Sequence, residues 1–129
     1  MSAYDDWKTT EPDCGVDEPP EHHWTCSCPE CFVDHPETVE RLLRLTVETR
    51  GLPAQADQAV EELAELIVAL RHWQRGRPGA IVQVAEELAD VQIMLDQLRL
   101  GFGPEFAAEV DAVRSAKLSR LAVRLGAEP

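Results

Sequence analysis

The sequence predicts an all-α fold, a four-helix bundle, and three observations indicate it. The chain has 129 residues, the size of one domain, and 44% of them are hydrophobic. Aromatic residues make up only 5%, so aliphatic side chains supply most of the apolar surface, which favours packed helices over a β sandwich. From residue 37 onward, apolar residues recur three and four positions apart, the spacing of an amphipathic helix.

Glycine and proline divide this region into four expected helices. The first is expected from about residue 37 to Gly51, and the second from Pro53, which suits a first helical turn, to Gly76. The third is expected at about 80–100 and the fourth at 104–126. Because the intervening loops are short, we expect an antiparallel bundle or paired hairpins.

Apolar stripes on these helices are expected to face a common core. The stripe of the second helix consists of Ala59, Leu63, Leu66, Ile67, Leu70 and Trp73, and that of the third of Ile81, Val84, Ala85, Leu88, Val91, Leu95 and Leu98. Trp73 and His72 lie at the end of the second helix. Trp73 continues the stripe and is expected in the core, whereas His72 is expected at the surface.

The charge of the chain excludes some partners. Its formal net charge is -12, so a nucleic-acid backbone would be repelled, and we expect no nucleic-acid binding. No apolar run approaches the ~20 residues that cross a bilayer, and the N-terminus lacks a basic segment followed by an apolar one. We therefore expect a cytoplasmic protein without membrane contact. An acidic protein can still act on a phosphate substrate when divalent cations bind between its carboxylates and the phosphates.

Residues 1–36 differ in composition from the helical domain expected at 37–129. This acidic extension is rich in Cys, His and Pro and is expected to be short and irregular. Its cysteines indicate a possible structural zinc site, since Cys28 and Cys31 have the spacing of two ligands from one turn. The expected ligand set is Cys14, Cys26, Cys28 and Cys31, with His22, His23 or His35 as alternatives to Cys14. The alternative is a flexible tail with reduced cysteines.

Paired carboxylates recur on the second and third expected helices. Glu62 and Glu65 lie three residues apart, as do Glu87 and Asp90, so each pair shares a helix face. Two antiparallel helices would bring the four together, and like charges so close repel unless protonated or bridged by cations. Magnesium prefers oxygen ligands and binds substrate phosphates, so this pattern indicates a magnesium site. Taken singly, each pair is typical of an ordinary solvated helix face.

The order Glu-x-x-Glu, spacer, Glu-x-x-Asp resembles the signature of the MazG-like all-α nucleoside triphosphate pyrophosphohydrolases, in particular their compact, phage-type, single-domain members. The resemblance extends over residues 37–125 and includes the segments 60–66, 86–91 and 117–121. It implies magnesium ligation by Glu62, Glu65, Glu87 and Asp90, with manganese as a possible substitute. It also implies that Lys117 and Arg120 bind substrate phosphates and that the protein is a homodimer or homotetramer.

The resemblance implies magnesium-dependent hydrolysis of nucleoside triphosphates between the α and β phosphates, which yields a nucleoside monophosphate and pyrophosphate. The four carboxylates would then be catalytic as well as metal-binding. For a nucleotide substrate, Trp73 and His72 are the candidates for contacting the base. An alternative hypothesis is a non-catalytic helical binding or adaptor protein, whose zinc-stabilised N-terminal segment contacts another protein.

Overall fold

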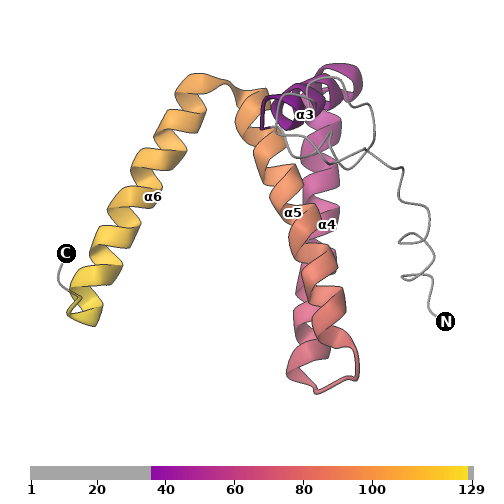
Figure 1. The fold of residues 1–129 in the computed structure, drawn as a ribbon, viewed down its shortest axis with the longest axis vertical. Helices are drawn as coiled ribbons and strands as arrows, with labels where there is room; N and C mark the ends of the chain where they lie inside the picture. Colours follow the sequence, from indigo (N-terminus) through magenta and orange to yellow (C-terminus); the bar gives the residue numbers. More distant parts are fainter. Residues whose placement is uncertain (1–35, 128–129) are drawn as a thin grey trace, which may run out of the picture. The chain divides into compact units, whose positions relative to one another are not determined.

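The computed structural model describes residues 36–127, which form four helices: α3 (Pro36–Arg50), α4 (Leu52–Gln74), α5 (Ala80–Phe102) and α6 (Pro104–Leu125) (Figure 1). This part of the chain contains no strand, so the predicted all-α class is confirmed. The predicted helix limits differ from the observed ones by about two residues, the usual uncertainty at helix ends. None of these four helices is both long and apolar enough to span a bilayer.

Glycine ends these helices because its backbone adopts conformations that other residues avoid. Gly51, with φ 87°, separates α3 from α4, and Pro53 then occupies the first turn of α4. Gly103, with φ 99°, is the single residue between α5 and α6. The chain therefore changes direction at a point where a side chain would be strained.

Contacts divide the chain into two units, and the boundary falls inside α3. The unit that begins at Leu43 contains the second half of α3 and all of α4, α5 and α6. Within this unit, Gly101 of α5 lies against side chains from α3 and α4. A Cβ atom at Gly101 would come within 2.5 Å of Leu52 Cδ1 and 3.2 Å of Val47 Cγ1. The absence of a side chain there lets the end of α5 pack closely against both.

An antiparallel hairpin of α4 and α5 forms the centre of this unit. Gln55 near the start of α4 donates a hydrogen bond to Gln97 near the end of α5, and His72 contacts Gln83 near the connecting turn. Along each helix, small or partly buried side chains recur at alternating intervals of four and three residues, the spacing of a coiled-coil interface. We call the line along which these side chains meet the seam. The seam consists of Gln55, Ala59, Glu62, Leu66 and Ala69 on α4 and of Ala80, Val84, Glu87, Val91, Met94 and Leu98 on α5.

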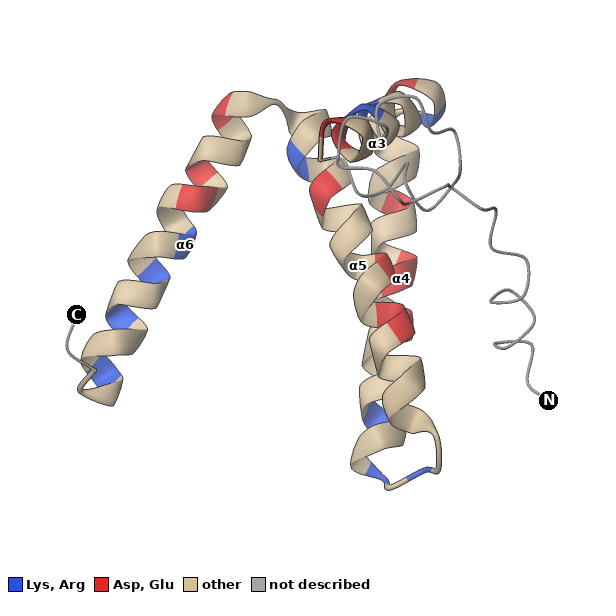
Figure 2. Ribbon diagram, in the orientation of Figure 1, with Lys and Arg blue, Asp and Glu red and all other residues tan. Residues whose placement is uncertain are grey.

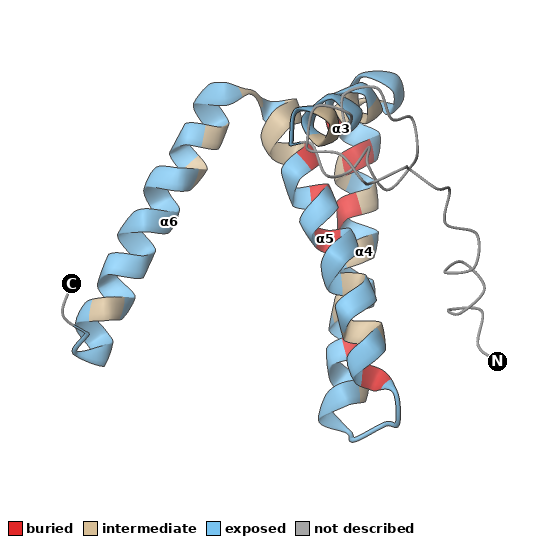
Figure 3. Cartoon of the chain, in the orientation of Figure 1, coloured by how far each residue is buried: buried red, intermediate tan, exposed pale blue. Residues whose placement is uncertain are grey.

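Few of the described residues are buried (Figure 3). Most residues of the predicted core stripes are exposed, so the prediction that they are buried is wrong for them. The buried apolar residues among those described are Leu43, Ala59, Ala69, Ala80, Val91 and Met94. Most of the predicted stripe, including Leu63, Ile67, Leu70, Ile81, Leu88 and Leu95, is exposed, and Trp73 is 53% exposed rather than in the core. The helices of the hairpin meet along their alanines, which allow closer approach, and leave the larger aliphatic side chains uncovered.

Helix α6 contacts α5 near the corner at Gly103 and buries none of its own residues. At the corner the rings of Phe102 and Phe106 lie 4.8 Å apart, and Arg99 Nη2 donates to both carboxylate oxygens of Asp111 at 3.0 Å. These two contacts connect the last turn of α5 to the first two turns of α6. The predicted burial of an α6 stripe is therefore wrong for the single chain.

Candidate metal centre

The four predicted carboxylates meet on the α4–α5 hairpin. One carboxylate oxygen from each of Glu62, Glu87 and Asp90 lies within 4.8 Å of the other two. The Glu65 carboxylate lies close enough to that of Glu87 to raise its pKa. Figure 2 shows acidic residues from both helices gathered around the middle of the hairpin. Residues 25 positions apart in sequence thus share one site because the helices run antiparallel.

Two of these carboxylates occupy positions that an apolar residue normally fills. Glu62 and Glu87 lie on the seam itself and are half-buried, whereas Glu65 and Asp90 are exposed beside it. Within residues 36–127, no lysine or arginine forms an ion pair with any of the four. An unpaired charge at a helix–helix seam costs free energy, so a positively charged partner beyond the described residues would stabilise it.

The electrostatics of the cluster are visible at Glu87. Partial burial is the largest cause that raises the pKa of Glu87 above its ordinary value of 4.5. The Glu65 carboxylate adds to the effect through its charge and through a hydrogen bond, and the charges of Asp90 and Glu62 add further. All of these influences favour the protonated form of Glu87. A cation bound among these oxygens would instead favour the ionised carboxylate.

Gln58, one helical turn before Glu62, orients that carboxylate. Its Nε2 donates a hydrogen bond to Glu62 Oε1 at 2.7 Å, in a partly buried setting. Sequence reasoning missed Gln58, although its spacing of four residues from Glu62 is the signal that could have identified it. The bond restricts the Glu62 rotamer and leaves its second oxygen for another partner.

The remaining predicted residues do not join the carboxylates. Glu61 and Glu86, which precede the seam glutamates by one residue, are exposed. Lys117 and Arg120 are exposed on α6, and no ion pair connects either to the four carboxylates in the part of the chain that the structure describes. The predicted zinc ligands lie outside the described residues, so zinc binding stays a prediction. They are Cys14, Cys26, Cys28 and Cys31, with His22, His23 and His35 as the alternatives.

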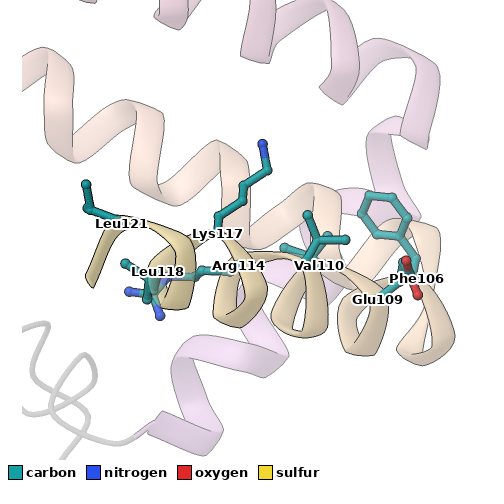
Figure 4. A pocket seen from close by; sticks show the side chains of 8 residues that line it. Phe106, Glu109, Val110, Arg114, Lys117, Leu118 and Leu121 are labelled. Carbon is teal, nitrogen blue, oxygen red and sulfur yellow. The ribbon is translucent and has the colours of Figure 1, made fainter. Parts of the chain in front are cut away.

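A groove with a volume of ≈ 570 Å³ runs along α6, away from the acidic cluster (Figure 4). Its walls come from α6 alone: Phe106, Glu109, Val110, Val113, Arg114, Lys117, Leu118 and Leu121. Figure 4 shows Lys117 extending on the same side as Phe106 and Val110. Because one helix supplies every wall, the groove is an open helix flank rather than an enclosed binding cavity.

The turn between α4 and α5 positions the two candidates for base contact. Arg77 Nη1 lies 3.3 Å from His72 Nε2, and since arginine can only donate, Nε2 accepts. His72 Nδ1 therefore carries the proton and donates to Gln83 Oε1 at 3.1 Å. This geometry gives His72 a role in holding the turn. Trp73 is exposed next to it, so its contact with a base stays a prediction.

Comparisons of the chain with protein-family models, with curated proteins and with solved structures found no match.

Proposed function

We propose that the protein is a magnesium-dependent hydrolase that converts nucleoside triphosphates to nucleoside monophosphates and pyrophosphate. The observation that carries the proposal is the placement of Glu62 and Glu87 on the helix seam, unpaired by any basic side chain among residues 36–127 and adjacent to Glu65 and Asp90. Such an arrangement is unfavourable without a cation and favourable with one.

The donor set fits magnesium. All four groups are carboxylates on two packed helices, and hard oxygen ligands from a rigid scaffold are what magnesium prefers, with manganese as a substitute. Bound metal would supply a water of lowered pKa and neutralise phosphate charge. The protein would contribute the fixed positions of the oxygens, with Gln58 holding Glu62.

Substrate phosphates are proposed to contact Lys117 and Arg120, because these cations on α6 have no carboxylate partner among the described residues. The protein is proposed to act as a homodimer or homotetramer. Twenty large hydrophobic side chains are exposed in the single chain, which favours self-association.

The test is pyrophosphate release from a panel of nucleoside triphosphates with magnesium or manganese. Glu62→Gln and Glu87→Gln should each lower kcat/KM by about 100-fold or more, since each removes a metal ligand. Glu61→Gln and Glu86→Gln are matched controls, because they make the same chemical change on the same helices at exposed positions. The controls should keep activity within a few fold.

Two outcomes would contradict the proposal. One is full activity in both Glu62→Gln and Glu87→Gln, which would remove the carboxylates from the mechanism. The other is no release of pyrophosphate from any nucleotide, together with no binding of magnesium by calorimetry. That second result would favour the alternative of a helical adaptor protein.

A further inference from the structure

The hairpin has a second face, opposite in character to the acidic one. Seven large aliphatic side chains remain 39–66% exposed there or at its margin, although the sequence pattern places most of them in a core stripe. They are Val60, Leu63, Ile67 and Leu70 on α4 and Ile81, Leu88 and Leu95 on α5. We call this set the apolar face of the hairpin.

Helix geometry places the α4 and α5 residues of the apolar face on the same side of the hairpin. Leu63 and Leu88 each follow a seam residue by one position, so each lies about 100° around its helix from the seam. In an antiparallel pair, the residue after a seam position points to the same side of the hairpin on both helices. The acidic pairs lie on the other side, since Glu65 and Asp90 each follow a seam glutamate by three positions.

The single chain has too little core to leave this face in water. No large side chain among residues 36–127 is fully buried, and three of the six buried apolar residues are alanines. Small domains with so little core usually acquire stability through oligomerisation, a metal or disulfides. A contiguous aliphatic face is the part of this chain that an additional subunit would cover most favourably.

Charges at the two ends of the hairpin identify the kind of partner that fits. Asp57 on α4 and Asp96 on α5 are exposed at the end away from the turn, whereas Arg71, Arg75 and Arg77 are exposed at or near the turn (Figure 2). None of these side chains forms an ion pair within the described residues. Arg99 also lies at the end away from the turn but is paired with Asp111 of α6, so the unpaired charges of the hairpin are acidic at that end and basic at the turn.

We propose that the apolar face pairs with the same face of a second copy of this chain, in antiparallel orientation about a two-fold axis. This orientation places the acidic end of each hairpin beside the basic end of the other, and a two-fold axis repeats every contact. Asp57 and Arg71 lie at similar distances on either side of the middle of the face, so Asp57 approaches Arg71 of the second copy. Parallel pairing would instead place like charges together.

The pairing defines the assembly around the candidate metal centre. It rests on the proposed self-association and not on the proposed hydrolysis. Four helices, two from each copy, share the new core, and each acidic face remains on the outside. The dimer therefore carries two metal centres that face away from each other, each open to substrate.

The test measures the mass of the full-length chain by light scattering after gel filtration. We expect twice the 14.4 kDa of one chain at micromolar concentration. Ile67→Glu, at a 61% exposed position in the middle of the face, should weaken dimerisation by at least 100-fold while circular dichroism stays helical. Val123→Glu is the matched control, because Val123 is 80% exposed on α6, outside the face, and should leave the dimer intact.

A charge reversal tests the orientation even if Ile67→Glu unfolds the chain. Asp57→Arg and Arg71→Asp should each weaken dimerisation by about threefold to tenfold, and the double variant should restore it. A monomeric wild-type protein, a dimer that survives Ile67→Glu, or no restoration in the double variant would each overturn the proposal. A dimer that hydrolyses no nucleotide would overturn the proposed function alone.

Discussion

Two polar pairs lie at or beside the seam between α4 and α5, and they differ in charge, burial and hydrogen bonding. Gln55 and Gln97 are neutral, buried and bonded to each other. Glu62 and Glu87 are ionisable, half-buried and surrounded by further carboxylates, with no basic partner in the described chain. The first pair is complete within the protein and has a structural role. The second has no such partner among the described residues, and this difference is the physical basis for the proposed metal site.

The glutamine pair should show the largest effect on stability. Gln97→Ala leaves the Gln55 amide buried without its partner, which should lower the free energy of unfolding by about 1–3 kcal/mol. Chemical denaturation monitored by circular dichroism measures this change.

The control is the double variant Gln55→Leu/Gln97→Leu, which removes both polar groups and should cost less than Gln97→Ala. Equal stability of Gln97→Ala and wild type would mean that the pair is not buried in solution, and the contrast with the glutamates would fail.

A smaller effect is expected from the residue that orients the acidic site. Gln58→Ala removes the hydrogen bond to Glu62 and should weaken magnesium binding by about tenfold, the lower end of what an outer-shell partner contributes. Titration calorimetry measures the affinity. Gln92→Ala, an exposed glutamine on α5 without a described bond to the cluster, serves as the control. Unchanged affinity in Gln58→Ala would show that Glu62 needs no support.

The smallest effect concerns pH. Because the folded chain raises the pKa of Glu87, the unfolded chain loses that proton first as pH increases from about 4.5. The unfolded state then binds fewer protons than the folded one, so metal-free stability should fall as pH rises through this window. Glu87→Gln cannot titrate there, so its thermal midpoint in EDTA should fall less between about pH 4 and about pH 7. Parallel profiles for the two proteins would contradict the raised pKa.

Helix limits could be predicted because they depend on local chemistry. Gly51, Gly79, Gly103 and Gly126 all adopt positive φ at or next to a helix end, as turn residues do. The proximity of the carboxylates could also be predicted, since it follows from helix periodicity and one short turn. Their roles in catalysis and metal binding stay predictions, as do those of Lys117 and Arg120.

The identity of the core could not be predicted from the same pattern. A stripe such as Leu63, Ile67 and Leu70 indicates which side of α4 avoids water, but not which neighbour covers it. The hairpin instead packs through Ala59 and Ala69, whose small size permits close approach but contributes little to a hydrophobicity pattern. Gln55 and Gln97 were missed for the same reason, because burial of an amide depends on a partner 42 residues away.

The alanines of the seam also have a consequence for ion selectivity. Ala69 has no exposed surface and Ala80 is 4% exposed, so the two helices pack closely beside the turn. A bulkier residue at either position would act as a wedge and spread the carboxylates two turns away. A wider cage suits calcium, whose oxygen ligands lie at about 2.3–2.6 Å, better than magnesium, whose ligands lie at about 2.0–2.1 Å. In the proposed metal site, the preferred radius of the ion would thus depend on methyl groups that do not contact it.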